Sequence, residues 1–291
     1  MNIKNEAMKK TLTWLLVLLL SANSSLLRAQ TDGSGQPTAA TAVPMHVKLW
    51  RDGKVVARYE VGTAVDSLSF TVFDSDSTKQ SLGGGHYMVD GHEFVDLGLP
   101  SGLLWATTNV GTDDELEAGG YYAWGGTSTR TTYKRETYEF YDQKTPAVWL
   151  RYYLGDKRTI LEPRDDAATV NWGPNCRIPQ LEEFRELADT AYCSWTWVSL
   201  ATSSTPEPHY GMLVKSKTNG NQIFLPAAGS YMDTTLTANG TYGLYWTATR
   251  YPSAYTTAFD CAYDFIFGSD IAQEESDYYR YYGNSVRAVS E

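Results

Sequence analysis

The chain of 291 residues is poor in the side chains that carry most catalytic and metal-binding chemistry. It has only four histidines and three cysteines. The histidines show no triad or HExxH spacing, and the cysteines match no CxxC or zinc pattern. Nucleophile-elbow, P-loop and dinucleotide-binding motifs are also absent from the sequence. We therefore predict that the protein is not an enzyme and has no catalytic residues, no metal site and no cofactor.

Positive charge is scarce as well. The chain has 24 Lys and Arg residues against 34 Asp and Glu residues, which gives a formal net charge of −10. Such an acidic protein repels phosphate backbones and anionic lipid surfaces. We therefore do not expect nucleic acid or a membrane surface as a partner.

The chain has one pronounced apolar run, and it lies near the N-terminus. Lys9 and Lys10 precede apolar residues 12–20, and small and polar residues follow to Ala29. This arrangement is typical of a secretory signal peptide and is too short for a membrane span. We predict cleavage after Ala29, with Ala22 as an alternative. The expected destination is the extracellular space or the outer cell surface, with no membrane insertion after cleavage.

The three cysteines, Cys176, Cys193 and Cys261, are an odd number for an exported protein. Oxidising compartments favour disulfides, so one disulfide and one buried thiol is the simplest expectation. Sequence alone leaves the pairing open.

Composition divides the remaining chain into four parts. Residues 30–44 are rich in Thr, Gly, Ala and Pro and are predicted to be a linker. Residues 45–73 form a small β unit, with a hairpin turn at Asp52 and Gly53 and a third strand-like run at 67–73. Residues 74–85 are rich in Ser and Gly and are predicted to be a second linker. Residues 86–291 have a uniform β-rich pattern and form the main domain.

The central strand of this domain is predicted around Phe224. Asn219 and Gly220 offer the positive-φ positions of a tight hairpin turn. The continuous apolar run 223–225 is typical of a strand that is covered on both faces. Pro226 follows, and small residues at 227–229 allow a close approach of neighbouring backbone.

Two helices and an alternating strand complete the prediction. Residues 181–190 place apolar side chains on one helical face, and residues 165–170 suggest a shorter helix capped by Asp165 and Asp166. Residues 258–267 alternate, which predicts Cys261 on a buried face and Asp264 on the opposite face. The predicted fold class is α+β, with mostly β structure.

Several sequence blocks in the main domain resemble a known family in their order. They are residues 95–102, 104–107, 109–111, 123–125, 165–168, 172–173, 177–179, 193–197, 219–229, 245–246 and 285–287. In this order they resemble the Fibrobacter succinogenes major paralogous domain, which is common in secreted proteins of Bacteroidetes. The resemblance covers residues 86–291. It implies a C-type-lectin-like fold, in which two short helices pack on twisted antiparallel sheets. The small β unit at 45–73 is similar, more weakly, to segments that often precede this domain.

The chain departs from the family pattern at four places. Thr108 stands where the family often has a cysteine, and Cys176 stands where it often has a tryptophan, so the resemblance leaves Cys176 as a candidate partner for Cys193. Gly126 replaces a glutamate, and Gln180 replaces the threonine that would cap the second helix, which makes the cap weaker.

Two segments of the sequence contain possible cation ligands. Glu207, Pro208 and His209 are near the Glu-Pro-Asn motif with which calcium-dependent lectins bind sugars, but His supplies no oxygen ligand. The acidic run 113–117 is more typical of a solvated loop. We therefore expect binding without a metal ion.

Aromatic residues remain as candidate ligand contacts, because 21 tyrosines and 9 tryptophans are many for this length. The predicted ligand-binding residues are Trp195, Trp197, Tyr278, Tyr279, Arg280 and Tyr281. They lie in strand-like runs and occupy both odd and even positions, whose side chains point to opposite faces of a strand. Some of the rings should therefore reach the surface, where they can stack on sugars. The alternative is that these rings clamp sheets and loops together. The sequence thus predicts an exported, non-enzymatic binding module for a glycan or a surface protein. The alternative function is a structural or assembly subunit of a surface appendage.

Overall fold

The computed structural model describes residues 45–51, 54–61, 79–142, 144, 149–201, 207–252, 261–271 and 274–291. For residues 45–61, 154, 274 and 275 only the backbone is described. Strands β1 (Met45–Arg51) and β2 (Lys54–Val61) pair antiparallel, with Arg51 opposite Lys54. This confirms the predicted hairpin. The predicted signal peptide at 1–29, the linker at 30–44 and the third run at 67–73 lie outside the described residues.

A five-stranded antiparallel sheet has the strand order β15-β6-β5-β4-β3. Its strands are β3 (Lys79–Gly83), β4 (His86–Val89), β5 (His92–Asp96), β6 (Leu104–Asn109) and β15 (Arg287–Ser290). Strand β3 corrects the predicted linker at 74–85, because Lys79 pairs with Val89 and extends the sheet. The Ser and Gly content of the segment hid a short edge strand.

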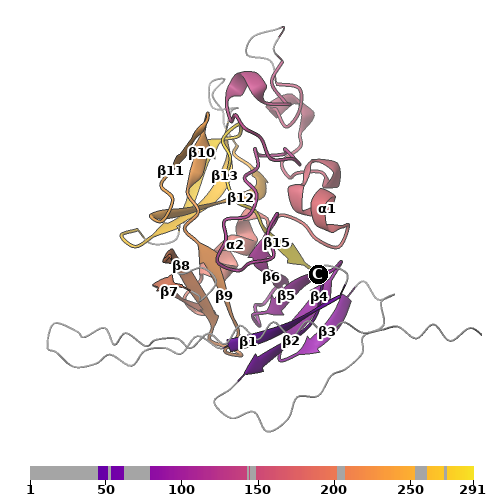
Figure 1. Ribbon diagram of the computed structural model, residues 1–291. Helices are drawn as coiled ribbons and strands as arrows, with labels where there is room; N and C mark the ends of the chain where they lie inside the picture. The colour runs from indigo at the N-terminus through magenta and orange to yellow at the C-terminus, as the bar shows by residue number, and fades with distance from the viewer. Residues whose placement is uncertain are drawn as a thin grey trace, which may run out of the picture.

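Two three-stranded sheets and one short ribbon make up most of the rest (Figure 1). The first sheet contains β7 (Cys193–Leu200), β8 (His209–Ser216) and β9 (Gln222–Pro226). The second contains β12 (Tyr242–Arg250), β13 (Cys261–Gly268) and β14 (Glu274–Tyr279). The ribbon pairs β10 (Ser230–Met232) with β11 (Thr235–Thr237). Predominantly antiparallel sheets with two short α-helices confirm the α+β class.

The two α-helices are α1 (Ala167–Trp172) and α2 (Leu181–Ala188), and single 3₁₀ turns lie at Arg135–Thr137, Leu154–Asp156 and Pro163–Asp165. Asp166 caps α1 by accepting the N–H of Thr169 at 3.0 Å. Glu183 in the first turn of α2 accepts the N–H of Gln180 at 2.7 Å, which is half of a capping box. Figure 1 shows α2 near the middle of the molecule. No described helix has the length and apolar character needed to cross a membrane.

The buried residues form two clusters, and strand β6 lies between them. Leu104 and Ala106 belong to one cluster, whereas Trp105 belongs to the other. Successive side chains of a strand point to opposite faces, so both faces of the sheet are covered here. All six residues of β6 are accordingly buried.

The strand around Phe224 differs from its prediction in two respects. Residues 223–225 are buried, as predicted, but β9 lies at the edge of its sheet rather than at the centre. A loop at 217–221 joins β8 to β9, closed by the N–H of Ser216 donating to Asn221 at 2.8 Å. Gly220 has a positive φ of 81°, and Asn219 is not among the residues with positive φ. The edge of β9 is instead capped by the buried Arg287, whose Nη2 donates to the carbonyl of Phe224 at 2.9 Å.

Strand β13 is buried on both of the faces that its alternating pattern defines. Phe265 and Phe267 are buried as predicted, but Asp264 on the opposite face is also fully buried. The cluster that contains Leu104 and Ala106 covers this second face and includes Ala262. Burial raises the pKa of Asp264 to about 8, and the nearby Asp277 adds to this effect.

The predicted disulfide is not formed. Cys176, Cys193 and Cys261 are all free and buried. Cys176 and Cys193 belong to different core clusters, which explains why this pair is not linked. Burial raises the pKa of Cys176 to about 12 and that of Cys193 to about 11, so both thiols are protonated at neutral pH.

Candidate functional site

Four tyrosines gather where β14 ends. They are Tyr278, Tyr279, Tyr281 and Tyr282, and we call them the tyrosine cluster. The rings of Tyr279 and Tyr281 are stacked, with centroids 5.2 Å apart and an interplanar angle of 14°. The ring of Tyr282 meets both edge-on, at 5.5 Å from Tyr279 and 5.0 Å from Tyr281. The ring of Tyr278 lies 5.1 Å from that of Tyr282.

A backbone turn creates this cluster. The strand ends at Tyr279, and the N–H of Tyr282 donates to the carbonyl of Tyr279 at 2.9 Å. The carbonyl of Arg280 is held by the N–H of Trp124 at 2.8 Å. In a continuous strand, neighbouring rings would point to opposite faces, but the turn brings residues 279, 281 and 282 into mutual contact.

Arg280 anchors the turn from inside the protein. Its side chain is fully buried, and its guanidinium carbon lies 4.4 Å from the ring centroid of Trp149. The rings of Trp124 and Tyr138 lie at 5.6 and 5.8 Å. Such cation–π contacts are stronger when the cation is removed from water. The predicted ligand contact at Arg280 is therefore corrected, since this side chain does not reach the surface.

Tyr279 is the most exposed member of the cluster, with 41% of its surface accessible. Tyr281 stacks on its ring and Tyr282 meets it at nearly a right angle, so the rest of the Tyr279 side chain accounts for this exposure. The guanidinium of Arg135 lies 5.7 Å from the ring centroid of Tyr281, and exposed Asp277 precedes the cluster on β14. The cluster therefore combines an exposed aromatic residue with nearby charged side chains.

Burial raises the pKa of Tyr278 to about 12 and also raises the pKa of Tyr282. These hydroxyls are therefore protonated at physiological pH, where each can both donate and accept a hydrogen bond.

The predicted tryptophans lie on a different surface. Trp195 is a core anchor, because its Nε1 donates to the carbonyl of Leu187 at 3.0 Å and its ring packs on Phe265 and Phe267 at 5.8 Å. Trp197 is half-buried and lies nearly parallel to exposed Tyr210, with centroids 6.4 Å apart. Trp195 is partly buried, so its packing on β13 leaves less of the ring available to a ligand, and its predicted role as a ligand contact stays a prediction.

The register of β13 separates the two surfaces. Trp195 packs at Phe265 and Phe267, whereas Tyr279 pairs with Cys261 at the other end of the strand. The four residue steps of strand from Cys261 to Phe265 span roughly 13 Å. The structure therefore brings the predicted tyrosines together but does not join them to the tryptophans.

Sequence reasoning missed two contributors to these surfaces. Arg135 and Tyr210 come from distant segments, and no local pattern links them to their partners. Tyr282 belongs to the aromatic run that suggested a binding surface, although it is not among the predicted ligand-binding residues.

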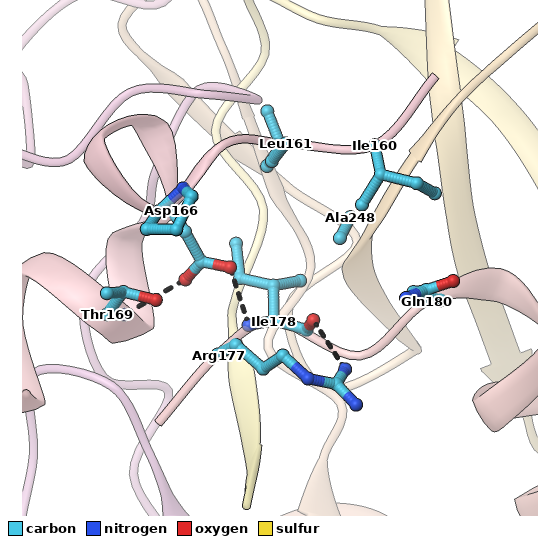
Figure 2. Close-up of a pocket in the computed structure, with 9 residues that line it drawn as sticks. Ile160, Leu161, Asp166, Thr169, Arg177, Ile178, Gln180 and Ala248 are labelled. Atoms are coloured by element: carbon cyan, nitrogen blue, oxygen red, sulfur yellow. Dashed lines mark hydrogen bonds between the residues drawn. The ribbon is translucent and has the colours of Figure 1, made fainter. Parts of the chain in front are cut away.

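A small pocket of about 70 Å³ lies beside α1, between the segment that leads into α2 and strand β12 (Figure 2). Its polar groups bond to one another. Asp166 accepts the N–H of Ile178 at 2.8 Å, and Arg177 pairs with both oxygens of Glu183 at 2.7 Å. Burial raises the pKa of Asp166, while its backbone hydrogen bonds oppose that shift. We assign these groups to holding the two helix entries in place.

The remaining predicted polar motifs are structural or exposed. His209 begins β8, and its Nδ1 lies 3.0 Å from the carbonyl of Leu116, while Glu207 is exposed. Asp165 lies within hydrogen-bonding distance of Arg151 and of the hydroxyl of Tyr152, the latter at 2.6 Å. In the part of the chain that the structure describes, no three His, Cys, Asp or Glu side chains gather as a metal site would require.

Comparison of the chain with models of protein families, with curated proteins and with solved structures finds no match in any of the three.

Proposed function

We propose that the protein is an exported binding module that holds a glycan by stacking a sugar ring on the tyrosine cluster, without catalysis. The observation that carries this proposal is the 41% exposure of Tyr279, whose ring is supported by the parallel ring of Tyr281. Sugar rings present apolar C–H faces, and an aromatic ring provides a flat surface of matching size and polarity. The hydroxyl groups of the tyrosine cluster can form hydrogen bonds with the hydroxyl groups of the sugar.

Rigid support favours this surface over an isolated exposed ring. The buried guanidinium of Arg280 fixes the turn in the ring environment of Trp124 and Trp149. A ring that is already held in place loses less conformational freedom when a ligand binds, so more of the stacking free energy appears as affinity.

The proposal extends to a C-type-lectin-like fold of the kind that the resemblance implies. Antiparallel sheets with two short helices are compatible with it, and the block at residues 177–179 leads into α2 as the resemblance implies. A fold of this type is compatible with many ligands, so the ligand class is argued from the tyrosines alone.

Glycan-array binding of the mature protein tests the proposal. The protein is purified from the envelope or the medium, where we expect it to begin at Gln30, and it is probed both with calcium and with EDTA. We expect the same glycans to be retained under both conditions. Replacement of Tyr279 by Ala should weaken binding by roughly 1–3 kcal/mol, as for other aromatic hot spots, whereas Tyr279→Phe should keep most of the affinity.

Tyr210→Ala is the matched control, because Tyr210 has the same exposed fraction of 41% and lies on the other aromatic surface. This variant should bind like the parent protein. Loss of binding in EDTA, or equal binding by the Tyr279→Ala variant, would contradict the proposal. Capture of an envelope protein with no glycan signal would favour the alternative of a protein ligand.

A further inference from the structure

Asp264 is a buried carboxyl group that is not part of the tyrosine cluster. It lies on β13, the middle strand of its sheet, and is fully buried. The buried Asn284 faces it, with Asn284 Nδ2 donating to Asp264 Oδ2 at 3.4 Å. The second carboxyl oxygen of Asp264 and the side-chain oxygen of Asn284 have no hydrogen-bond partner among the described residues. Buried polar atoms are seldom left in this state, so these two oxygens require an explanation.

One proton satisfies both oxygens. An ionised carboxylate and an amide oxygen can only accept hydrogen bonds, whereas a neutral carboxylic acid also donates one. With a proton on its Oδ1, Asp264 can donate to the Oδ1 of Asn284 while it accepts from the Nδ2 of the same residue. The two side chains then form a reciprocal pair. Burial of a charged carboxylate is costly, and this also favours the protonated form.

The groups on the neighbouring strands favour the same form. On β12, Trp246 stands opposite Asp264, and on β14 the opposite residue is Ser276, so neither partner is ionisable. Asp277, also on β14, raises the pKa of Asp264, and Asp264 in turn raises the pKa of Tyr278. Hydrogen bonds act in the opposite direction, but burial is the largest effect and raises the pKa of Asp264 to about 8.

Asn284 belongs to a segment that follows the tyrosine cluster directly and precedes β15. Residues 283–285 form isolated bridges with Tyr231, Tyr122 and Tyr245 in turn, rather than a continuous ladder. Asn284 exchanges backbone hydrogen bonds with Tyr122 at 3.0 and 3.1 Å. Isolated bridges open more easily than a ladder, because fewer hydrogen bonds have to break together. The buried side-chain pair therefore adds a contact with β13 that these backbone bridges do not supply.

We propose that Asp264 and Asn284 form a proton-dependent latch, which holds residues 283–285 and the adjoining end of the tyrosine cluster against β13. The latch is closed by two hydrogen bonds while Asp264 is protonated. Opening brings the carboxyl group into water, where it releases its proton to the solvent, so a rising pH favours the open form. This dependence ends at the pH at which the closed form itself loses the proton. The inference stands whether or not the tyrosine cluster binds a glycan.

Amide hydrogen exchange measures the opening of the latch. The protection factors of residues 283–285, corrected for the intrinsic effect of pH on exchange, should fall about tenfold per pH unit between pH 5 and pH 8. Asp264→Asn should remove this slope, because its amide can form the same two hydrogen bonds at every pH. Asp113→Asn, at an exposed position, should keep the slope. The amides of β6 should be more strongly protected at each pH, since they exchange only on global unfolding.

Infrared spectroscopy tests the protonation state of Asp264 without reference to motion. At pH 6 the parent protein should show the carbonyl absorption of a neutral carboxylic acid that is missing from Asp264→Asn and retained in Asp113→Asn. This absorption should disappear as the pH is raised through about 8. An ionised Asp264 at pH 6, a slope in hydrogen exchange that survives Asp264→Asn, or equal protection of residues 283–285 and β6 at every pH would overturn the proposal.

Discussion

The two ends of strand β13 carry aromatic rings in opposite surroundings. At one end Phe265 is 1% exposed, stacked on Phe184 at 4.9 Å and covered by Trp195. At the other end Cys261 pairs with Tyr279, whose ring opens to solvent. The same class of side chain therefore stabilises the fold at one end and forms a candidate binding surface at the other. The difference comes from what packs on the strand, since α2 and β7 contribute Phe184 and Trp195 only at the first end.

The largest expected effect on stability concerns Phe265, at the buried end of β13. Phe265→Ala should lower the free energy of unfolding by about 3–5 kcal/mol, because it leaves a cavity among rings that cannot collapse fully into it. Phe265→Leu should cost less, since more of the volume is retained. Denaturant melts of both variants measure the difference. A loss below about 1 kcal/mol for the alanine variant would show that this end is not a packed core.

Asp264, in the middle of β13, predicts that the stability of the protein depends on pH. The pKa of Asp264 is raised from 3.8 to about 8 by burial. Between these values the folded protein binds one proton more than the unfolded chain, so stability falls as pH rises. We expect a slope of up to roughly 1.4 kcal/mol per pH unit between pH 5 and pH 8, and little further change from this group above pH 8.

Melts across this pH range check the slope, and Asp264→Asn should remove it, because the amide stays neutral. Asp113→Asn, at an exposed loop position, is the control and should keep the parent slope. A parent protein whose stability rises with pH over this range, or an Asp264→Asn variant that retains the slope, would contradict the assignment.

The smallest effect on stability is expected at the open end. Tyr279→Ala should lower the free energy of unfolding by no more than about 1 kcal/mol, because the side chain is partly exposed and the turn is held by Arg280. Its effect on glycan binding should be the larger one. If this variant instead unfolds as readily as Phe265→Ala, the tyrosine cluster is part of the packing and the contrast between the two ends disappears.

Local patterns predicted the local elements well. The amphipathic stripe at 181–190 indicated α2, and its buried residues Leu181, Phe184 and Leu187 lie on the predicted face. The hairpin at Asp52 and Gly53, the cap at Asp166 and the buried run at 223–225 were also predicted correctly. Each of these features depends on side chains a few residues apart, whose spacing already defines which face they share.

Features that depend on distant partners were not predictable from those patterns. The alternation in β13 fixed which residues share a face, but it could not show that Asp264 would be covered as well. The run at 278–282 had the composition of a strand, and only its pairing with Trp124 shows a turn with Arg280 inside. The expected disulfide failed for the same reason, since no spacing showed that Cys176 and Cys193 enter different clusters.

The sequence by itself determined where the two helices and several of the strands form, that the class is α+β, and that aromatic residues are the candidate ligand contacts. The tertiary structure decided which of those aromatic residues are available. Trp195 is held by Leu187 and the rings of β13, Arg280 is enclosed by Trp124 and Trp149, and Tyr279 stays open. The physical reason is that exposure depends on segments far away in the chain, which reach a residue only after the sheets have assembled.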